Sequence, residues 1–279
     1  FCAWGAVLDT RWKIHKFGGS SLADADCFRR VAGLMLDRDD ARIGVVVSAM
    51  GGMTDALLRL VALAERDDHG FETELNAIGQ RYADTARSLL SDDALVATLD
   101  AWSQDADDIR DVLKAVALVK SAQQRSRDVV AGYGEIWSAR MLAALLGQES
   151  AERGGTWIDA RRVITVSETE LGPTVQWSRS QANFDELVAG EFTGIAVITG
   201  FIASDEDGLQ TTLGRNGSDY SAAIFAALSR ADELSIWTDV DGVMSADPNR
   251  VPELIQHLPA SILTELEGLN PASRDLTTL

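Results

Sequence analysis

Short runs of hydrophobic residues alternate along the chain with longer stretches of helical periodicity. The clearest runs are IGVVVSA (43–49), GIAVITGF (194–201) and ELSIWTDV (233–240). Nearly continuous Val and Ile, without strict apolar and polar alternation, is typical of strands that are buried on both faces of a parallel sheet. Two further segments, WKIHKF (12–17) and GTWIDAR (155–161), are predicted to be strands as well.

Helical patterns lie between these strands. Apolar residues recur at i, i+3, i+4 and i+7 in two segments, at Phe28, Val31, Ala32 and Met35 and at Ile109, Val112, Leu113 and Val116. No segment between about residues 54 and 130 reads as a strand, and residues 170–181 are predicted to be a loop or turn. The pattern predicts one α/β domain with a helical insertion over 54–130.

Composition is that of a soluble globular protein with room for a large core. The chain has 279 residues, of which 46% are hydrophobic and 24% charged. Its formal net charge of −18 disfavours non-specific binding to nucleic acid, because a phosphate backbone would be repelled. Any anion must therefore be bound by a few local cations and backbone N–H groups.

The cysteine count and the absence of a long apolar stretch indicate where such a protein works. Cys2 and Cys27 cannot form a disulfide framework, which fits a reducing, cytoplasmic location. No apolar stretch approaches the ~18 residues of a membrane span, so no membrane partner is expected. Residues 1–13 are interrupted by Asp9 and Arg11, and are interpreted as a poorly ordered leader rather than a signal peptide.

Three glycine-rich turns each lead into a predicted helix. They are KFGGSS (16–21), SAMGGMT (48–54) and LGRNGSD (213–219). Each presents backbone N–H groups at a helix N-terminus, where the helix dipole favours an anion. Lys16 and Arg215 add a cation to two of the turns. One such turn alone usually just connects a strand to a helix, whereas three together indicate a polyphosphate site.

The turns do not match the common nucleotide-binding motifs. A P-loop would need G-x-x-x-x-G-K-[ST], and a dinucleotide site would need G-x-G-x-x-G after the first strand. The H-R-D and D-F-G pair of eukaryotic-type kinases is missing as well. The third turn places Gly214 and Gly217 before Ser218, which is predicted to be the N-cap of the following helix. Phosphate chemistry in this chain therefore needs a different scaffold.

Six sequence blocks in order resemble those of the aspartokinase family. They are HKFGGSSLADADCFRRVA, VVVSAMGGMTDALL, GYGEIWSARML, VITGFIA, TTLGRNGSDYSAA and IWTDVDGVMSADP. The resemblance covers roughly residues 14 to 256 and is greatest to the kinase portion of bifunctional aspartokinase–homoserine dehydrogenases. It implies the amino acid kinase fold, a three-layer αβα arrangement with a mostly parallel sheet. It also implies a catalytic domain over 14–279, with no ACT or dehydrogenase domain in this chain.

The resemblance further implies an activity and its ligands. Family members transfer the γ-phosphoryl group of ATP to the side-chain carboxylate of aspartate, at the start of lysine, threonine and methionine biosynthesis. ATP would arrive with Mg²⁺ held mainly by phosphate oxygens, and no protein metal site is expected. The partners implied are aspartate and ATP, and a homodimer is an assembly that the sequence allows.

Individual roles follow from the matching motif positions. Lys16 is expected to stabilise the transferring phosphoryl group, and Asp219 to orient Lys16 and the substrate. The planar guanidinium of Arg215 suits a carboxylate and would hold the α-carboxylate of aspartate. The other expected substrate contacts are Ser48, Thr54, Glu135 and Phe201. The expected nucleotide contacts are Gly18, Gly19, Gly214, Gly217, Ser218, Thr238 and Asp239.

Simpler readings compete with some of these roles. Without the resemblance, Glu135 in GYGEIWSAR would be an ordinary first-turn glutamate at a helix start, and Asp219 would be a first-turn carboxylate too. A related kinase acting on glutamate, acetylglutamate or a nucleotide monophosphate is a second functional hypothesis. The family's F-G-A-K-x-x-H-P motif is not found after Pro248. That departure keeps a third hypothesis, a non-catalytic subunit that binds effectors or a partner.

Overall fold

A parallel sheet, of five strands in the described part of the chain, forms the centre of the protein. The computed structural model describes residues 11–66, 70–170, 172–188 and 192–237. The strands lie in the order β3–β6–β2–β1–β9. Their bounds confirm the five predicted strands, with β1 at Trp12–Phe17, β2 at Arg42–Val47, β3 at Gly155–Ile158, β6 at Gly194–Thr199 and β9 at Glu233–Trp237. Because β1 begins at residue 12, residues 12 and 13 belong to this strand rather than to the expected leader.

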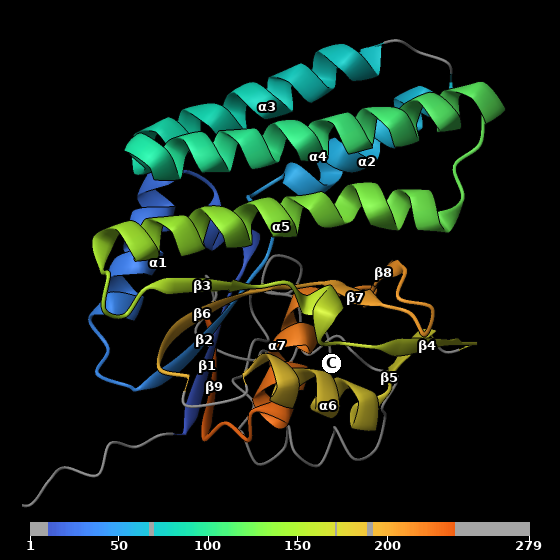
Figure 1. The fold of residues 1–279 in the computed structure, drawn as a ribbon. Coiled ribbons are helices and arrows are strands. Elements are labelled where there is room, and N and C mark those ends of the chain that lie inside the picture. The colour runs from blue at the N-terminus through green and yellow to red at the C-terminus, as the bar shows by residue number, and fades with distance from the viewer. Residues whose placement is uncertain (1–10, 67–69, 171, 189–191, 238–279) are drawn as a thin grey trace, which may run out of the picture.

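Helices cover both faces of this sheet (Figure 1). On one face lie α1 (Ala25–Leu36), α2 (Met53–Glu65), α3 (Gly70–Leu89), α4 (Asp92–Val119) and α5 (Gln124–Glu149). On the other face lie α6 (Trp177–Leu187) and α7 (Gly217–Leu228). The predicted three-layer αβα class is confirmed. The predicted helical insertion is present as α2 to α5, with no strand among the residues described between β2 and β3, but its last helix runs on to Glu149 instead of ending near residue 130.

The sheet separates two hydrophobic cores. Along β2, the side chains of Val45 and Val47 pack into the core beneath α1–α5, whereas Val46 packs into the core beneath α6 and α7. Successive side chains of a strand point to opposite faces, so a run with no polar break places apolar groups on both sides. This explains why the near-continuous Val and Ile runs predict a covered parallel sheet.

Helix α5 is the central helix of the larger core. By length and composition it could cross a membrane, yet 83% of its most apolar window is buried inside the fold. It packs on β3 and β6 and against α2 and α4. That is how the central helix of a globular domain behaves, and the burial accounts for its apolar composition.

The segment around Pro173 is not the loop that its sequence suggests. Residues Gly172–Val175 form β5, which pairs in antiparallel fashion with β4 (Val166–Thr169), and α6 begins at Trp177. Two four-residue strands are too short to carry a periodic pattern, and a Gly-Pro pair normally marks a turn. Pro173 is tolerated because a strand in a two-stranded ribbon has a free edge that needs no donor.

Four smaller elements complete the described chain. They are the 3₁₀ turns η1 (Gly19–Leu22) and η2 (Ala160–Arg162) and the antiparallel pair β7 (Ile202–Ser204) and β8 (Gln210–Thr212). The β7–β8 pair carries the chain from the end of β6 to the start of α7. It therefore sets the position from which the third glycine-rich turn enters α7.

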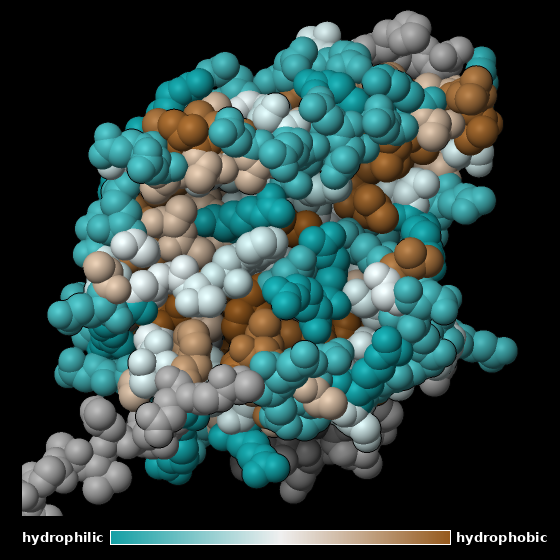
Figure 2. Space-filling model, viewed as in Figure 1, coloured by the Kyte–Doolittle hydropathy of each residue, from teal (hydrophilic) through white to brown (hydrophobic). Residues whose placement is uncertain are grey.

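The visible surface is mostly hydrophilic, as the charge of the chain requires (Figure 2). One hydrophobic area lies where α4 ends, at the upper right of that view. Its most exposed side chains are Leu118, at 84% exposure, and Val119, at 66%.

Candidate active site

A cavity of about 390 Å³ opens at the carboxyl ends of β1, β2 and β6. Ligands of open parallel sheets bind at this edge, where loops and helix N-termini converge. Lys16 lies near the end of β1, Ser48 directly follows β2, and Phe201 lies two residues after β6. The N-terminal turns of α2 and α7 close the remaining sides.

Most of the residues predicted from the sequence line this one cavity. They are Lys16, Gly19, Ser48, Thr54, Glu135, Phe201, Gly214, Arg215, Gly217, Ser218 and Asp219. Gly18 is adjacent, since a Cβ on it would lie 3.6 Å from the Lys16 Nζ. Thr238 and Asp239, like the positions after Pro248, lie outside the described residues.

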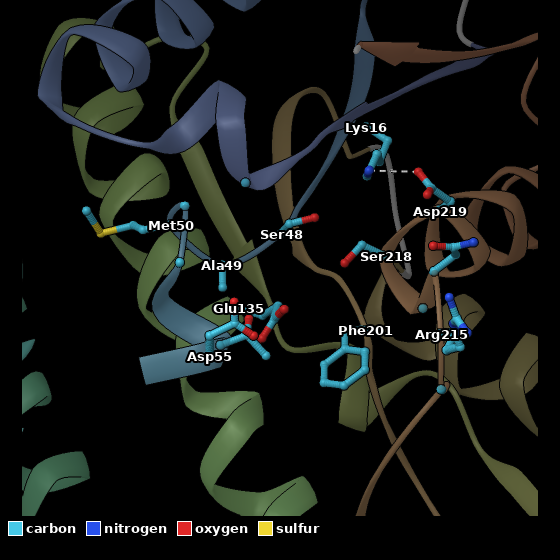
Figure 3. A pocket seen from close by; sticks show the side chains of 17 residues that line it. Lys16, Ser48, Ala49, Met50, Asp55, Glu135, Phe201, Arg215, Ser218 and Asp219 are labelled. Atoms are coloured by element: carbon cyan, nitrogen blue, oxygen red, sulfur yellow. Dashed lines mark ion pairs between the residues drawn. The ribbon is translucent and has the colours of Figure 1, made fainter. Parts of the chain in front are cut away.

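Sequence reasoning missed several lining residues. They are Ala49, Met50, Gly51, Gly52, Asp55 and Asn216. All six fall within or directly after the glycine-rich turns. The only signal in the sequence that could have indicated them is their position beside the turn residues that were predicted. Figure 3 shows the carboxylates of Glu135 and Asp55 on one side of the cavity and Lys16, Arg215 and Asp219 on the other.

Lys16 and Asp219 form the central ion pair. The Lys16 Nζ lies 2.7 Å from Asp219 Oδ1, and the lysine side chain is only 11% exposed. Lys16 comes from β1 and Asp219 from the first turn of α7, so the pair joins two elements that are far apart in sequence. A partly exposed pair of this kind fixes the ammonium at one wall of the cavity while leaving it close to solvent (Figure 3).

Glu135 lies in the middle of α5, not at a helix start as predicted. It is 4% exposed, and its Oε2 has no hydrogen-bond partner among the described residues. Burial raises the pKa of this carboxyl to about 8, although the backbone amides of Glu135 and Ala49 oppose the shift. Its neighbour Gly134 allows α5 to approach the turn after β2, since a Cβ there would lie 2.8 Å from the Ala49 Cβ.

Arg215 lies in the exposed turn between β8 and α7. Among the described residues its guanidinium makes no ion pair or hydrogen bond, although it lines the cavity. The turn is shaped by two residues with left-handed backbone, Gly214 at φ +76° and Asn216 at φ +53°. An unpaired guanidinium beside a cavity can take an anionic ligand in bidentate fashion.

The predicted N-cap of α7 is wrong by two positions. Asn216 is the N-cap, while Ser218 is buried inside the first turn at 8% exposure. Asn accepts left-handed backbone more readily than most residues, which lets it occupy this position. The Gly217 amide already donates to the Gly214 carbonyl at 3.1 Å.

Phe201 forms a wall of the cavity in a strained backbone conformation, at φ +67°. Its amide donates to the Ser221 Oγ at 2.9 Å, and its carbonyl accepts from the Leu213 amide at 2.7 Å. Gly217 packs directly on it, since a Cβ on Gly217 would lie 2.7 Å from the Phe201 Cδ2. Such strain persists only where the surroundings enforce it, and it concentrates at functional sites.

Comparison with known proteins shows the family to which the chain belongs. A sequence model described as the amino acid kinase family matches residues 11–276, and the chain belongs to this family. It is 37% identical over 247 residues to bifunctional aspartokinase/homoserine dehydrogenase 1 of Arabidopsis thaliana, covering 88% of this chain and 27% of that protein. It is 34% identical over 241 residues to bifunctional aspartokinase/homoserine dehydrogenase 2 of Escherichia coli K12, covering 86% of this chain and 29% of that protein.

A solved structure shares the fold. Escherichia coli aspartokinase III in complex with aspartate and ADP superimposes with a TM-score of 0.75 at 28% identity. The match covers 95% of this chain and 58% of that one. The present chain thus spans less than a third of the two bifunctional relatives and over half of this neighbour.

Proposed function

We propose that this chain transfers the γ-phosphoryl group of ATP to the side-chain carboxylate of aspartate, forming 4-phospho-aspartate and ADP. The observation that carries the proposal is the set of charged side chains that line the cavity. It combines a fixed lysine with an arginine and a buried carboxylate oxygen that have no partner among the residues the structure describes. The names of the relatives, and the aspartate and ADP bound to the structural neighbour, support it.

The chemistry asks for alignment and charge neutralisation more than for a base. A side-chain carboxylate with a reference pKa of ~3.9 is already ionised at neutral pH. Its oxygen forms a bond to the γ-phosphorus while the bond from that phosphorus to the bridging oxygen of ADP breaks. Two anions must meet for this to happen, and the Lys16 ammonium, held by Asp219, is placed to neutralise the charge between them.

The amino-acid end of the substrate matches the two sides of the cavity. Glu135 would accept the α-ammonium, which satisfies its unpartnered Oε2. Arg215 would grip the α-carboxylate from the opposite side (Figure 3). Ser48 and Thr54 would offer hydroxyl contacts, and Phe201 would form the wall.

The nucleotide would lie along the glycine-rich turns. Gly18 and Gly19 after β1, and Gly214 and Ser218 before and within α7, are the proposed phosphate contacts. The Gly217 amide is already in use, so its proposed part is to make room for Phe201. Thr238 and Asp239 stay predicted contacts, and Mg²⁺ would arrive with ATP as part of the substrate.

Trapping the acyl phosphate with hydroxylamine tests the proposal. The chain is incubated with Mg-ATP and aspartate, glutamate or N-acetylglutamate, and hydroxamate formation is measured. Hydroxamate from aspartate alone is expected, because N-acetylglutamate lacks the free α-ammonium that Glu135 would accept and the names of the relatives point to aspartate rather than glutamate. A greater yield from glutamate or N-acetylglutamate would assign a related kinase. No product from any acceptor, in folded protein, would favour the non-catalytic alternative.

The proposal extends to the pathway and the cellular location of the protein. We propose that its product enters lysine, threonine and methionine biosynthesis and that the protein works in the cytoplasm, as its few cysteines predict. The homodimer that the sequence allows stays a prediction, which light scattering on the purified chain checks.

A further inference from the structure

Two of the glycine-rich turns meet backbone to backbone. A Cβ on Gly19 would lie 2.9 Å from the Ala49 carbonyl oxygen, and a Cβ on Gly51 would lie 3.2 Å from the Gly19 carbonyl oxygen. Because both residues are glycines, no side-chain contact between them can hold the two turns together. At the strand ends, the Ser48 amide holds them together by donating to the Phe17 carbonyl at 3.1 Å.

At the other end of these turns, one side chain from a third element spans the gap. Arg81 comes from α3, and its Nη2 donates to the Gly51 carbonyl at 2.8 Å and to the Ala23 carbonyl at 3.0 Å. Gly51 belongs to the turn after β2, and Ala23 follows η1 in the segment after β1. One nitrogen thus bonds to the turn after β2 and to the segment that directly follows the turn after β1.

Arg81 is not held by a carboxylate. Among the described residues it forms no ion pair, unlike Arg87 on the same helix, which lies 2.9 Å from Asp84. Its charge is therefore directed at two carbonyl oxygens, that of Gly51, which lines the cavity, and that of Ala23, just beyond the turn after β1. Hydrogen bonds from a charged donor are stronger than neutral ones, so this contact can fix the distance between the turns.

We propose that Arg81 is a positioning residue for phosphoryl transfer, which holds the turn after β1 and the turn after β2 in the relative position that the reaction needs. This proposal rests on the proposed function. Lys16 and Gly19 belong to the first turn, and Ser48 and Thr54 flank the second. Lys16, which would stabilise the phosphoryl group, and the hydroxyl groups that would contact aspartate thus belong to different turns. A shift of one turn against the other misaligns the two reactants without removing any group that binds them.

Kinetics of Arg81→Met test this, since methionine keeps an apolar stem and loses the charge and both donors. A drop in kcat of about ten- to a hundred-fold is expected, with KM for aspartate and for ATP within a few-fold. Arg81→Lys, which keeps a charged donor, should recover part of kcat. Arg87→Met is the matched control and should leave kcat unchanged. A folded Arg81→Met protein with wild-type kcat, or one in which only the melting temperature falls, would overturn the proposal.

Hydrogen–deuterium exchange of the ligand-free protein separates this proposal from the proposed function. Exchange in peptides covering residues 17–24 and 48–53 should rise in Arg81→Met and not in Arg87→Met. That result is expected even if the wild-type chain phosphorylates some other acceptor. Unchanged exchange in both segments would show that Arg81 does not hold the two turns in position, whatever the outcome of the hydroxylamine assay.

Discussion

Glu135 is the residue whose environment differs most from that of an ordinary surface carboxylate. It is buried in the central helix beside the cavity, and in the described part of the chain its Oε2 has no hydrogen-bond partner. A buried charge without a partner is costly, so the free protein holds a proton there up to about pH 8. An incoming ammonium would supply the missing partner and displace that proton.

This exchange predicts a pH dependence of aspartate binding. Only the ionised form of Glu135 accepts the ammonium, so KM for aspartate should fall as pH rises towards 8 and then level off. The limiting slope is about tenfold per pH unit. KM measured from pH 6 to 9 checks this, with Glu135→Gln as the non-titrating variant. A wild-type KM that is flat over this range, or a Glu135→Gln variant that keeps the slope, contradicts the assignment.

Arg215 is proposed to grip the α-carboxylate of aspartate through two parallel N–H donors. Arg215→Lys keeps the charge and loses the two parallel donors that match a carboxylate. The kcat/KM for aspartate should fall by about ten- to a hundred-fold, which corresponds to roughly 1.5–3 kcal/mol. Because Arg215 is exposed, stability should not change. An equal rise of KM for ATP and for aspartate, in folded protein, would show that Arg215 does not select the amino acid.

At the scale of the elements, glycines decide how closely the helices approach the site. Gly217 begins α7 against Phe201, and Gly134 brings α5 against Ala49. Gly132 serves the same purpose against the side chains of Ile202 and Gln210. Glycine inside a helix costs about 1 kcal/mol relative to alanine, and here each one permits a close tertiary contact.

These glycines also explain where sequence reasoning succeeds and fails. The strands and the three turns were predictable, because buried parallel strands and strand-to-helix glycines leave local signals. The place of Glu135 was not, since GYG reads as a helix break until the packing of Gly132 and Gly134 is known. The N-cap at Asn216 and the β4–β5 pair likewise depend on contacts with distant segments.

Substituting Gly217 tests this packing role. Gly217→Ala puts a methyl group 2.7 Å from the Phe201 ring, and the overpacking should destabilise the fold by roughly 1–3 kcal/mol and lower activity. Gly33→Ala in α1 is the matched control, because nothing lies within 4 Å of its added Cβ. It should gain up to about 1 kcal/mol. Urea unfolding of both variants checks the pair, and equal effects would contradict the packing account.

At the scale of the whole molecule, the sheet that carries Lys16 also buries a histidine. His15 is fully buried in β1, where its Nδ1 accepts from the Trp237 Nε1 at 3.3 Å. Burial lowers its pKa from 6.5 to about 4, and Arg38 adds to this shift. Strands β1 and β9 are therefore joined through a neutral imidazole, one residue before Lys16.

The neutral state of His15 makes stability depend on pH. The unfolded chain takes up a proton near pH 6.5 and the folded protein only near pH 4, so stability is lost as pH falls between these values. From pH 7 to 5 the loss should be about 1–2 kcal/mol. His15→Asn keeps an acceptor and cannot titrate, so its loss should be smaller by this amount in urea unfolding. Identical losses in the two proteins would mean that His15 does not set the slope.

In the proposed reaction the Lys16 ammonium stabilises the transferring phosphoryl group, and the kinetics of Lys16→Ala test that role. Lys13→Ala on the same strand is the control, since Lys13 pairs with Asp232 rather than with Asp219. With ATP affinity measured on the same samples by calorimetry, kcat of Lys16→Ala should fall by about 10²–10³-fold while the Kd for ATP changes little. A folded Lys16→Ala protein that keeps most of its kcat would contradict the account.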